Sequence, residues 1–317
     1  MGRGRRLVGR HSDNQEAGKD RNTMNVGYVG LGSMGGGIVK RMLHNKQALR
    51  VFDLDPKKIS EMVGHGAQAS QSPAALAEAS DVVCLCLPTS ANVHAAIFGD
   101  NGLAHGLKPG TIVADMTTGD PLKTKEMAAE LAKKGVIMID APVSGGPAGA
   151  AAGTLAIMVG APVEVFERIK PVFEKVGPNV FRVGDLGAGQ TMKLVNNLML
   201  ATGRAIAFEA MALAVKNGID PKLATEILNK SSGRNGTTER SLAETVDGKF
   251  PASFAIGLMT KDVRLANQLG QDTGVPMILG RIVEELHNVA INNHGAGACS
   301  NILIKDFEQR AKVKITK

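Results

Sequence analysis

A lysine and two asparagines begin an otherwise apolar segment, GQTMKLVNNLMLATG, at residues 189–203. If the segment is a helix, Lys193 and Asn197 share one face, whereas Asn196 points away and makes a structural hydrogen bond. Lys193 can either extend to solvent along its methylene stem or be partly buried with an adjustable pKa. A partly buried amine beside an amide is suited to proton exchange with a substrate hydroxyl. The residues alone leave both interpretations open.

Three glycines in G-x-G-x-x-G spacing give a stronger signal. Gly30, Gly32 and Gly35 occur in VGLGSMGGG, directly after a strand-like apolar run and at the start of a helix-like one. In that context the pattern is typical of dinucleotide binding, because the turn is tight and the backbone must approach a pyrophosphate. We therefore expect the turn to bind the cofactor through Gly30, Leu31, Gly32, Ser33, Met34 and Gly35.

An acidic residue at the end of the next predicted strand bears on the choice of cofactor. Asp53 is placed where a carboxylate can accept hydrogen bonds from the adenosine ribose. Its charge would repel a 2′-phosphate, and Leu54 rather than an arginine follows it. The sequence therefore favours NAD over NADP, although Lys57 and Lys58 are close by.

The segment DAPVSGGPAGAAAGTLAIMVG, residues 140–160, is rich in small residues but follows a strand-like run. In parallel sheets, ligands bind at the carboxyl ends of the strands. Ser144, Gly145 and Gly146 stand at such an end, and consecutive glycine N–H groups can form an anion-binding concavity. A substrate carboxylate suits that position, but a purely structural glycine turn suits it equally well.

Short apolar runs such as DVVCLCLP and TIVADMTT alternate with helix-like segments as far as Gly187, which predicts a doubly wound, largely parallel sheet. Beyond it we expect a helix over residues 190–217 and further helices near 221–230, 237–246, 258–273 and 276–293. The predicted fold class is α/β. A Rossmann-type, mostly parallel sheet occupies residues 24–186, and an all-α C-terminal domain with the long interdomain helix occupies residues 187–317.

Composition narrows the classes of function. The chain has 317 residues, of which 44% are apolar and 21% charged, as expected for a soluble, cytoplasmic protein of two domains. We find no uncharged apolar run of about 18 residues, which argues against a membrane partner. With nine Phe, one Tyr and no Trp, the chain lacks the aromatic platforms on which nucleic acids stack.

The formal charge of +7 comes in part from residues 1–23, a basic segment too poor in large apolar side chains to order itself. We expect a disordered tail rather than a signal peptide. Cys84, Cys86 and Cys299 are expected to be reduced thiols. Since no Cys or His pairs occur at ligand spacing, no metal site is expected.

Several motifs occur together and in order: GLGSMG, LPTSANV, DMTTGDP, DAPVSGGPAGAAAGTLAIMVG, GAGQTMKLVNN, SSGR and LMTKDVRLA. Over about residues 24–290 the chain resembles the β-hydroxyacid dehydrogenase family. The resemblance implies a Rossmann-type domain, a long linking helix, a helical domain, bound NAD, a small carboxylate-bearing substrate, and dimers or tetramers formed through the helical domains. It also implies hydride transfer between a small 3-hydroxy acid, such as 3-hydroxyisobutyrate, and its semialdehyde.

The resemblance assigns a role to each motif. Lys193 becomes the catalytic acid/base and Asn197 its substrate-orienting partner. The remaining implied site residues bind the substrate carboxylate (Ser144, Gly145 and Gly146), lie near both nicotinamide and substrate (Thr118), or line and close over the cofactor (Leu87, Pro88, Asn92 and Lys261).

Two departures from the family pattern concern geometry: GGG at residues 35–37 lacks a proline, and HNKQALRVFD lacks a glycine. A third, NGTTER after SSGR, lacks the aromatic residue found near the substrate in enzymes of the valine pathway. The alternatives are a reductase of tartronate, glyoxylate or succinic semialdehyde and a dehydrogenase of the 2-(hydroxymethyl)glutarate type. A non-catalytic scaffold of the same fold is disfavoured by the presence of Lys193, Asn197 and Ser144 together.

Overall fold

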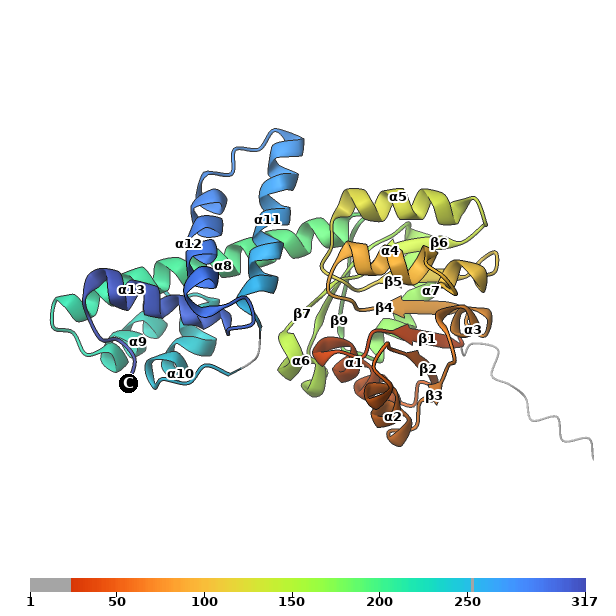
Figure 1. Cartoon of the computed structure of the whole chain (residues 1–317), viewed down its shortest axis with the longest axis horizontal. Coiled ribbons are helices and arrows are strands. Elements are labelled where there is room, and N and C mark those ends of the chain that lie inside the picture. The colour runs from red at the N-terminus through yellow and green to blue at the C-terminus, as the bar shows by residue number, and fades with distance from the viewer. Residues whose placement is uncertain (1–23, 252–253) are drawn as a thin grey trace, which may run out of the picture.

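The computed structural model describes residues 24–251 and 254–317. The basic tail predicted for residues 1–23 lies outside the described residues. In the described chain, a β-sheet flanked by helices is followed by a helical region, and one long helix joins the two (Figure 1). The predicted fold class, a Rossmann-type α/β sheet followed by a helical C-terminal region, is confirmed.

The first half of the chain alternates between short strands and helices. The strands are β1 (Val26–Val29), β2 (Leu49–Phe52), β3 (Gln68–Ala69), β4 (Val82–Leu85), β5 (Ile112–Asp115), β6 (Ile137–Asp140), β7 (Val143–Ser144), β8 (Ala156–Gly160) and β9 (Asn179–Gly184). The helices are α1 (Ser33–His44), α2 (Pro56–Gly64), α3 (Pro73–Glu78), α4 (Ser90–Phe98), α5 (Pro121–Ala132), α6 (Gly146–Ala152) and α7 (Val163–Glu174).

Several helix starts are encoded locally by an acceptor side chain followed by proline. The pairs are Asp55–Pro56, Ser72–Pro73 and Asp120–Pro121, at the starts of α2, α3 and α5. In each pair the side chain accepts a backbone N–H of the first turn. Proline has no N–H and occupies a position where no intrahelical partner exists. These pairs fix the residues at which the three helices begin.

Within the described residues, nine strands form one sheet in the order β3-β2-β1-β4-β5-β6-β8-β7, with β9 paired to β8. The strands from β3 to β6 are parallel, whereas β8 runs antiparallel to β6 and β7 and parallel to β9. The strand order reverses at β1, between β2 and β4, and sheets of this kind bind ligands at the carboxyl edge of such a point.

Each face of the sheet has its own core, because successive side chains of a strand point in opposite directions. On β4, Val82 and Cys84 pack with side chains of α1, α2, α6 and α7. Val83 and Leu85 pack with side chains of α3, α4 and α5. The run VIMIDAPVSGG forms two strands, β6 and β7, and the following glycine and alanine residues form α6, which the sequence analysis did not identify.

The second half of the described chain is helical. It contains α8 (Ala188–Lys216), α9 (Pro221–Lys230), α10 (Ala243–Val246), α11 (Ile256–Thr273), α12 (Ile278–His294) and α13 (Leu303–Ala311). The helix predicted at 237–246 begins instead with a π-helical turn at Thr238–Leu242, and α13 was not predicted individually. Phe208 and Met211 of α8 lie in a core with Met259 of α11 and Phe307 of α13.

Helix α8 is the element shared by both halves. Its first turns contact β8 and β9, and its remainder packs against α11, α12 and α13 (Figure 1). Its 29 residues span roughly 43 Å at about 1.5 Å per residue. By length and composition alone, α8 also satisfies the criteria for a membrane span, which the sequence analysis had not found.

A truncation at the centre of the helical core should be costly. We expect Phe208→Ala to lower the free energy of unfolding by about 3–5 kcal/mol, because Phe208 is fully buried and its loss leaves a cavity. Chemical denaturation monitored by circular dichroism measures this change. Phe181→Ala removes the same atoms from a side chain that is 53% exposed, and should cost much less. Equal losses in the two variants would contradict this description of the core.

Candidate active site

Lys193 lies on the second turn of α8 and retains only 8% of its exposure. Burial lowers its pKa from 10.5 to about 8. The carboxylate of Asp262 opposes this shift, and the neighbouring charge of Lys261 adds to it. The Cys86 thiol, at the end of β4, also lies within electrostatic range of the amine. Of the two interpretations left open by the sequence, the structure matches the partly buried amine with a lowered pKa.

Asn197 is buried on the same face of α8 as Lys193, as the four-residue spacing predicts. Its amide Nδ2 donates to Asp262 Oδ2 at 2.6 Å, and its Oδ1 accepts from Asn196 Nδ2 at 3.0 Å. Asn196 Nδ2 also lies 3.4 Å from Ser144 Oγ. Asn196 thus links α8 to the last residue of β7, in agreement with the structural role predicted for it.

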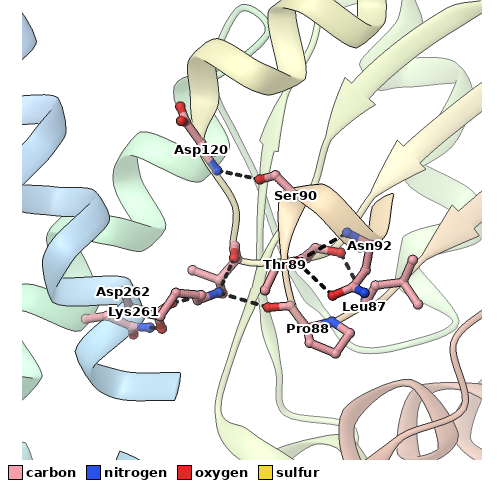
Figure 2. A network of polar contacts seen from close by, with 11 residues as sticks. Leu87, Pro88, Thr89, Ser90, Asn92, Asp120, Lys261 and Asp262 are labelled. Atoms are coloured by element: carbon pink, nitrogen blue, oxygen red, sulfur yellow. Dashed lines mark hydrogen bonds and ion pairs between the residues drawn. The ribbon is translucent and has the colours of Figure 1, made fainter. Parts of the chain in front are cut away.

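Lys261 reaches from α11 to the segment that follows β4 (Figure 2). Its amine donates to the carbonyl oxygens of Pro88 at 3.1 Å and Thr118 at 2.6 Å, and forms an ion pair of 3.0 Å with Asp262. Asn92 lies in the same region, where its Oδ1 accepts from Thr89 Oγ1 at 2.7 Å. A single lysine thereby connects the helical region to two segments at the carboxyl edge of the sheet.

The glycine-rich turn between β1 and α1 fits a dinucleotide, because two of its glycines permit close backbone packing and the third leaves open space for a ligand. Gly30 has a φ of +95°, and a Cβ there would collide with the Cys86 carbonyl oxygen. A Cβ on Gly35 would collide with the Gly30 carbonyl oxygen, so α1 packs directly against the turn. A Cβ on Gly32 would meet nothing within 4 Å, so its backbone is free to approach a ligand.

Asp53 follows β2 directly, and its side chain lies against the same turn. Its Oδ2 accepts the Leu31 N–H at 2.6 Å, and its Oδ1 accepts the Asp55 N–H at 2.9 Å. Lys58 Nζ lies 3.9 Å from Oδ1, and the Leu54 side chain is 93% exposed. Since each carboxylate oxygen has two acceptor sites, Asp53 holds the turn and still has capacity for ribose hydroxyls.

The predicted carboxylate-binding loop follows β7. Ser144 ends that strand, and Gly145 and Gly146 have φ values of +133° and +67°. A Cβ at Gly145 would press against Leu155, whereas one at Gly146 would point into open space. The backbone at these two positions therefore requires glycine, and at Gly146 it faces room for a ligand.

Comparisons with known proteins also indicate a nicotinamide-dependent dehydrogenase. Residues 25–184 match the family model described as the NAD binding domain of 6-phosphogluconate dehydrogenase, and residues 187–306 match "NAD-binding of NADP-dependent 3-hydroxyisobutyrate dehydrogenase". The chain is 40% identical to 2-(hydroxymethyl)glutarate dehydrogenase of Eubacterium barkeri, over 80% of this chain and 85% of that protein. It is 37% identical to 3-hydroxyisobutyrate dehydrogenase of Pseudomonas aeruginosa, over 83% of this chain and 91% of that protein.

Among solved structures, 3-hydroxyisobutyrate dehydrogenase from Salmonella typhimurium is similar, with a TM-score of 0.81 and 31% identity, over 89% of this chain and 99% of that one. The chain belongs to the β-hydroxyacid dehydrogenase family. This dehydrogenase is an NAD(P)-dependent oxidoreductase of small hydroxy acids. Within the described residues of the dehydrogenase, no cluster of His, Cys, Asp or Glu side chains could hold a metal ion.

Four polar residues around Lys193 and the first turns of α8 were not identified from the sequence. They are Asp262, which holds Asn197, and Asp115, Asp140 and Gln190, which connect α8 to the ends of β5 and β6. The sequence does indicate a position for Asp115 and Asp140. Each directly follows a strand-like apolar run and is the first residue of the motif DMTTGDP or DAPVSGG, which places both at the carboxyl edge of the sheet. Asp262 follows Lys261 in the motif LMTKDVRLA, and Gln190 precedes Lys193 by three residues in GAGQTMKLVNN, but neither motif indicates the contacts that these two residues make.

The two charges beside Lys193 should move its pKa in opposite directions. We expect Asp262→Asn to lower the pKa of Lys193 below about 8, because it removes the opposing carboxylate, and Lys261→Met to raise it. NMR titration of lysines labelled with ¹³C at Cε measures both shifts, with the signal assigned by Lys193→Arg. An unchanged value, or a shift of the same sign in both variants, would contradict this electrostatic description.

Proposed function

We propose that the dehydrogenase uses NAD to interconvert a small 3-hydroxy acid, such as 3-hydroxyisobutyrate, with its semialdehyde, and that Lys193 is the catalytic acid/base. The observation that carries this proposal is the buried Lys193 amine, with its pKa lowered to about 8. The amine lies within electrostatic range of Cys86, next to the predicted cofactor-lining residues, and its helix contacts Ser144 through Asn196. The segments proposed to bind cofactor and substrate are thus both linked to one buried amine, and this arrangement supports an acid/base role for Lys193.

The amine acts on the substrate hydroxyl. When bound, the nicotinamide exchanges two electrons and a proton with the carbinol carbon. In oxidation, neutral Lys193 accepts the hydroxyl proton, and in reduction the ammonium returns it to the developing alkoxide. Asn197 has one N–H directed to Asp262, so its second N–H remains to orient the substrate oxygen.

The carboxylate of the substrate would bind to the Ser144 hydroxyl and the backbone N–H groups of Gly145 and Gly146. The left-handed backbone at both glycines and the open space beside Gly146 support this role. Thr118 would lie between substrate and nicotinamide, because its carbonyl is already held by Lys261 at the carboxyl edge of the sheet.

The cofactor would bind along the turn from Gly30 to Gly35, through Gly30, Leu31, Gly32, Ser33, Met34 and Gly35. Leu87, Pro88 and Asn92 would line its nicotinamide side, where Lys261 holds the Pro88 carbonyl. We infer a preference for NAD over NADP from Asp53, whose carboxylate faces the turn and would repel a 2′-phosphate.

The 2-(hydroxymethyl)glutarate type of substrate is the second candidate, because the relative from Eubacterium barkeri is 40% identical over 80% of this chain. The segment NGTTER, which has no aromatic residue, also favours a substrate other than 3-hydroxyisobutyrate itself. A spectrophotometric panel with NAD and NADP tests both assignments. It compares 3-hydroxyisobutyrate, 3-hydroxypropionate, glycerate, 4-hydroxybutyrate and 2-(hydroxymethyl)glutarate.

Loss of the proposed acid/base should remove turnover and leave cofactor binding intact. We expect Lys193→Met to reduce kcat by about 10²–10⁴-fold while the Kd for NADH, measured by fluorescence, stays near that of the parent. In the parent, kcat/KM for oxidation should rise with pH up to about 8 and then level off, since the base must be neutral. The rate of reduction should fall above the same pH. Retained turnover in Lys193→Met would refute the assignment.

We further propose that the protein divides functionally at α8, into residues 24–186 and 187–317, and that it acts in the cytoplasm as a homodimer or homotetramer. Apolar side chains recur every seven residues on α8 and are substantially exposed: Met192, Met199, Ile206 and Leu213. A stripe of this kind is typical of a helix that packs against another subunit. The buried cations Lys193 and Arg204 on the opposite face favour this explanation of the apolar helix over a membrane span.

Charge on the exposed stripe should prevent assembly. We expect the double variant Ile206→Glu/Leu213→Glu to be monomeric in sedimentation velocity experiments, whereas the parent is dimeric or tetrameric, because two carboxylates cannot be buried unpaired. Val163→Glu, on α7, places a charge on a similarly exposed apolar side chain and serves as the control. A monomeric parent protein would contradict the proposed homodimer or homotetramer.

A further inference from the structure

A buried polar connection joins the start of α8 to the ends of two strands of the sheet. Asp140, at the end of β6, accepts the Gly187 N–H with Oδ1 and the Gln190 N–H with Oδ2, both at 2.7 Å. These are N–H groups at the beginning of a helix, which have no intrahelical partner. A Cβ on Gly189 would collide with the Met158 carbonyl oxygen, so the first turn of α8 lies directly on the sheet. Asp140 therefore fixes the backbone of α8 at the point where the helix begins.

The side chain of Gln190 extends the connection to β5. Its Nε2 donates to Asp115 Oδ2 at 3.1 Å, and its Oε1 accepts from Thr124 Oγ1 of α5 at 3.0 Å. Gln190, Asp115 and Thr124 are completely buried. An amide is the side chain that offers a donor to the carboxylate and an acceptor to the hydroxyl in one plane. With both of its ends engaged, the Gln190 side chain fixes the rotation of α8 about its axis.

From Asp115 the same connection continues to the proposed cofactor site. Asp115 Oδ1 accepts the Thr117 N–H at 2.9 Å, and Thr117 Oγ1 accepts the Leu87 N–H at 3.0 Å. Leu87 lies on the proposed nicotinamide side, and Lys193 stands three residues after Gln190, about 4.5 Å further along the helix axis. A continuous set of hydrogen bonds, partly buried at Leu87 and buried from Thr117 onward, therefore runs from the proposed cofactor-lining segment to the turn that precedes Lys193.

We propose that Gln190 is a positioning residue, which holds the Lys193 amine in register with the cofactor-lining segment at Leu87 through Asp115 and Thr117. This inference rests on the proposed function of Lys193. Proton transfer requires the amine within hydrogen-bond distance of the substrate oxygen, and misplacement by about 1 Å can cost about 10²-fold in rate. Apolar packing at this position would tolerate small rotations, whereas two directional bonds to buried groups do not.

The decisive variant is Gln190→Leu, which keeps the size of the side chain and removes both of its hydrogen bonds. We expect kcat to fall by about 10–100-fold, with KM and the NADH dissociation constant within about threefold of the parent. The primary deuterium isotope effect on kcat should rise, because chemistry becomes slower than product release. Gln71→Leu makes the same change at an exposed position and is the matched control.

A second variant, Gln190→Glu, keeps the proposal testable if Gln190→Leu fails to fold. Burial raises the pKa of Asp115 to about 7. At pH 6 the introduced carboxyl group and Asp115 can share one proton, which preserves the hydrogen-bond pattern. At pH 9 both carboxylates ionise and repel each other. Relative to the parent at each pH, kcat for reduction should therefore be close to normal at pH 6 and at least about tenfold lower at pH 9.

The outcomes separate this inference from the function on which it rests. Retained turnover by Lys193→Met would refute the proposed role of Lys193 as the catalytic acid/base. If Lys193→Met is inactive but a folded Gln190→Leu has normal kcat, or loses only NADH affinity, the positioning role is wrong. It is also wrong if Gln190→Glu is equally active relative to the parent at pH 6 and pH 9. A loss of kcat that simply follows a lowered Tm, and recovers on cooling, would likewise assign Gln190 to stability alone.

Discussion

The desolvation of one ammonium group is the constraint on which the rest of the site depends. Lys193 is buried on a helix between two halves of the protein, and burial holds its pKa at about 8 rather than 10.5. A desolvated amine is costly unless neighbouring groups compensate it. Asp262 provides part of that compensation from α11, while Lys261, beside it, is engaged with the carbonyls of Pro88 and Thr118. The helical region is therefore an electrostatic component of the site as well as its support.

The carboxyl edge of the sheet supplies the fixed frame for this amine. Asp115 and Asp140 end adjacent parallel strands, and both point to the start of α8. The glycine-rich turn after β1 is held by Asp53 at the same edge. Three aspartates at the ends of strands thus hold two elements at this edge, the glycine-rich turn proposed to bind the cofactor and the helix that carries the amine.

Periodicity and turn chemistry predicted most of the fold. The alternation of apolar runs and helix-like segments up to Gly187 predicted the sheet and its flanking helices from the sequence. Helix α6 was not predicted, because its short run of glycine, proline and alanine has no apolar periodicity and is compatible with a loop. The Asn235 side chain accepts the N–H groups of Thr237 and Thr238 where the predicted helix at 237–246 begins, and the π-helical turn at Thr238–Leu242 follows directly. The four-residue spacing predicted that Lys193 and Asn197 share one buried face of α8, as they do, and their proposed roles in catalysis come from the family resemblance. Asp262 and Gln190 form contacts between distant segments, as far apart in sequence as 75 residues for Gln190 and Asp115, and no local pattern reveals them.

The continuity of α8 has a consequence for how this chain can vary. Each residue of an α-helix advances the chain by about 100° of rotation. Inserting or deleting a single residue between Gln190 and Lys193 would rotate the Lys193 side chain by about 100° around the helix axis. A change of seven residues would nearly restore the rotation but would move the amine by about 10 Å along the axis. A length change beyond Arg204 would leave Gln190, Lys193 and Asn197 in place relative to the sheet, and would act on the site only through the packing of α11, which carries Lys261 and Asp262. Evolution can remodel the far end of this helix far more freely than its beginning.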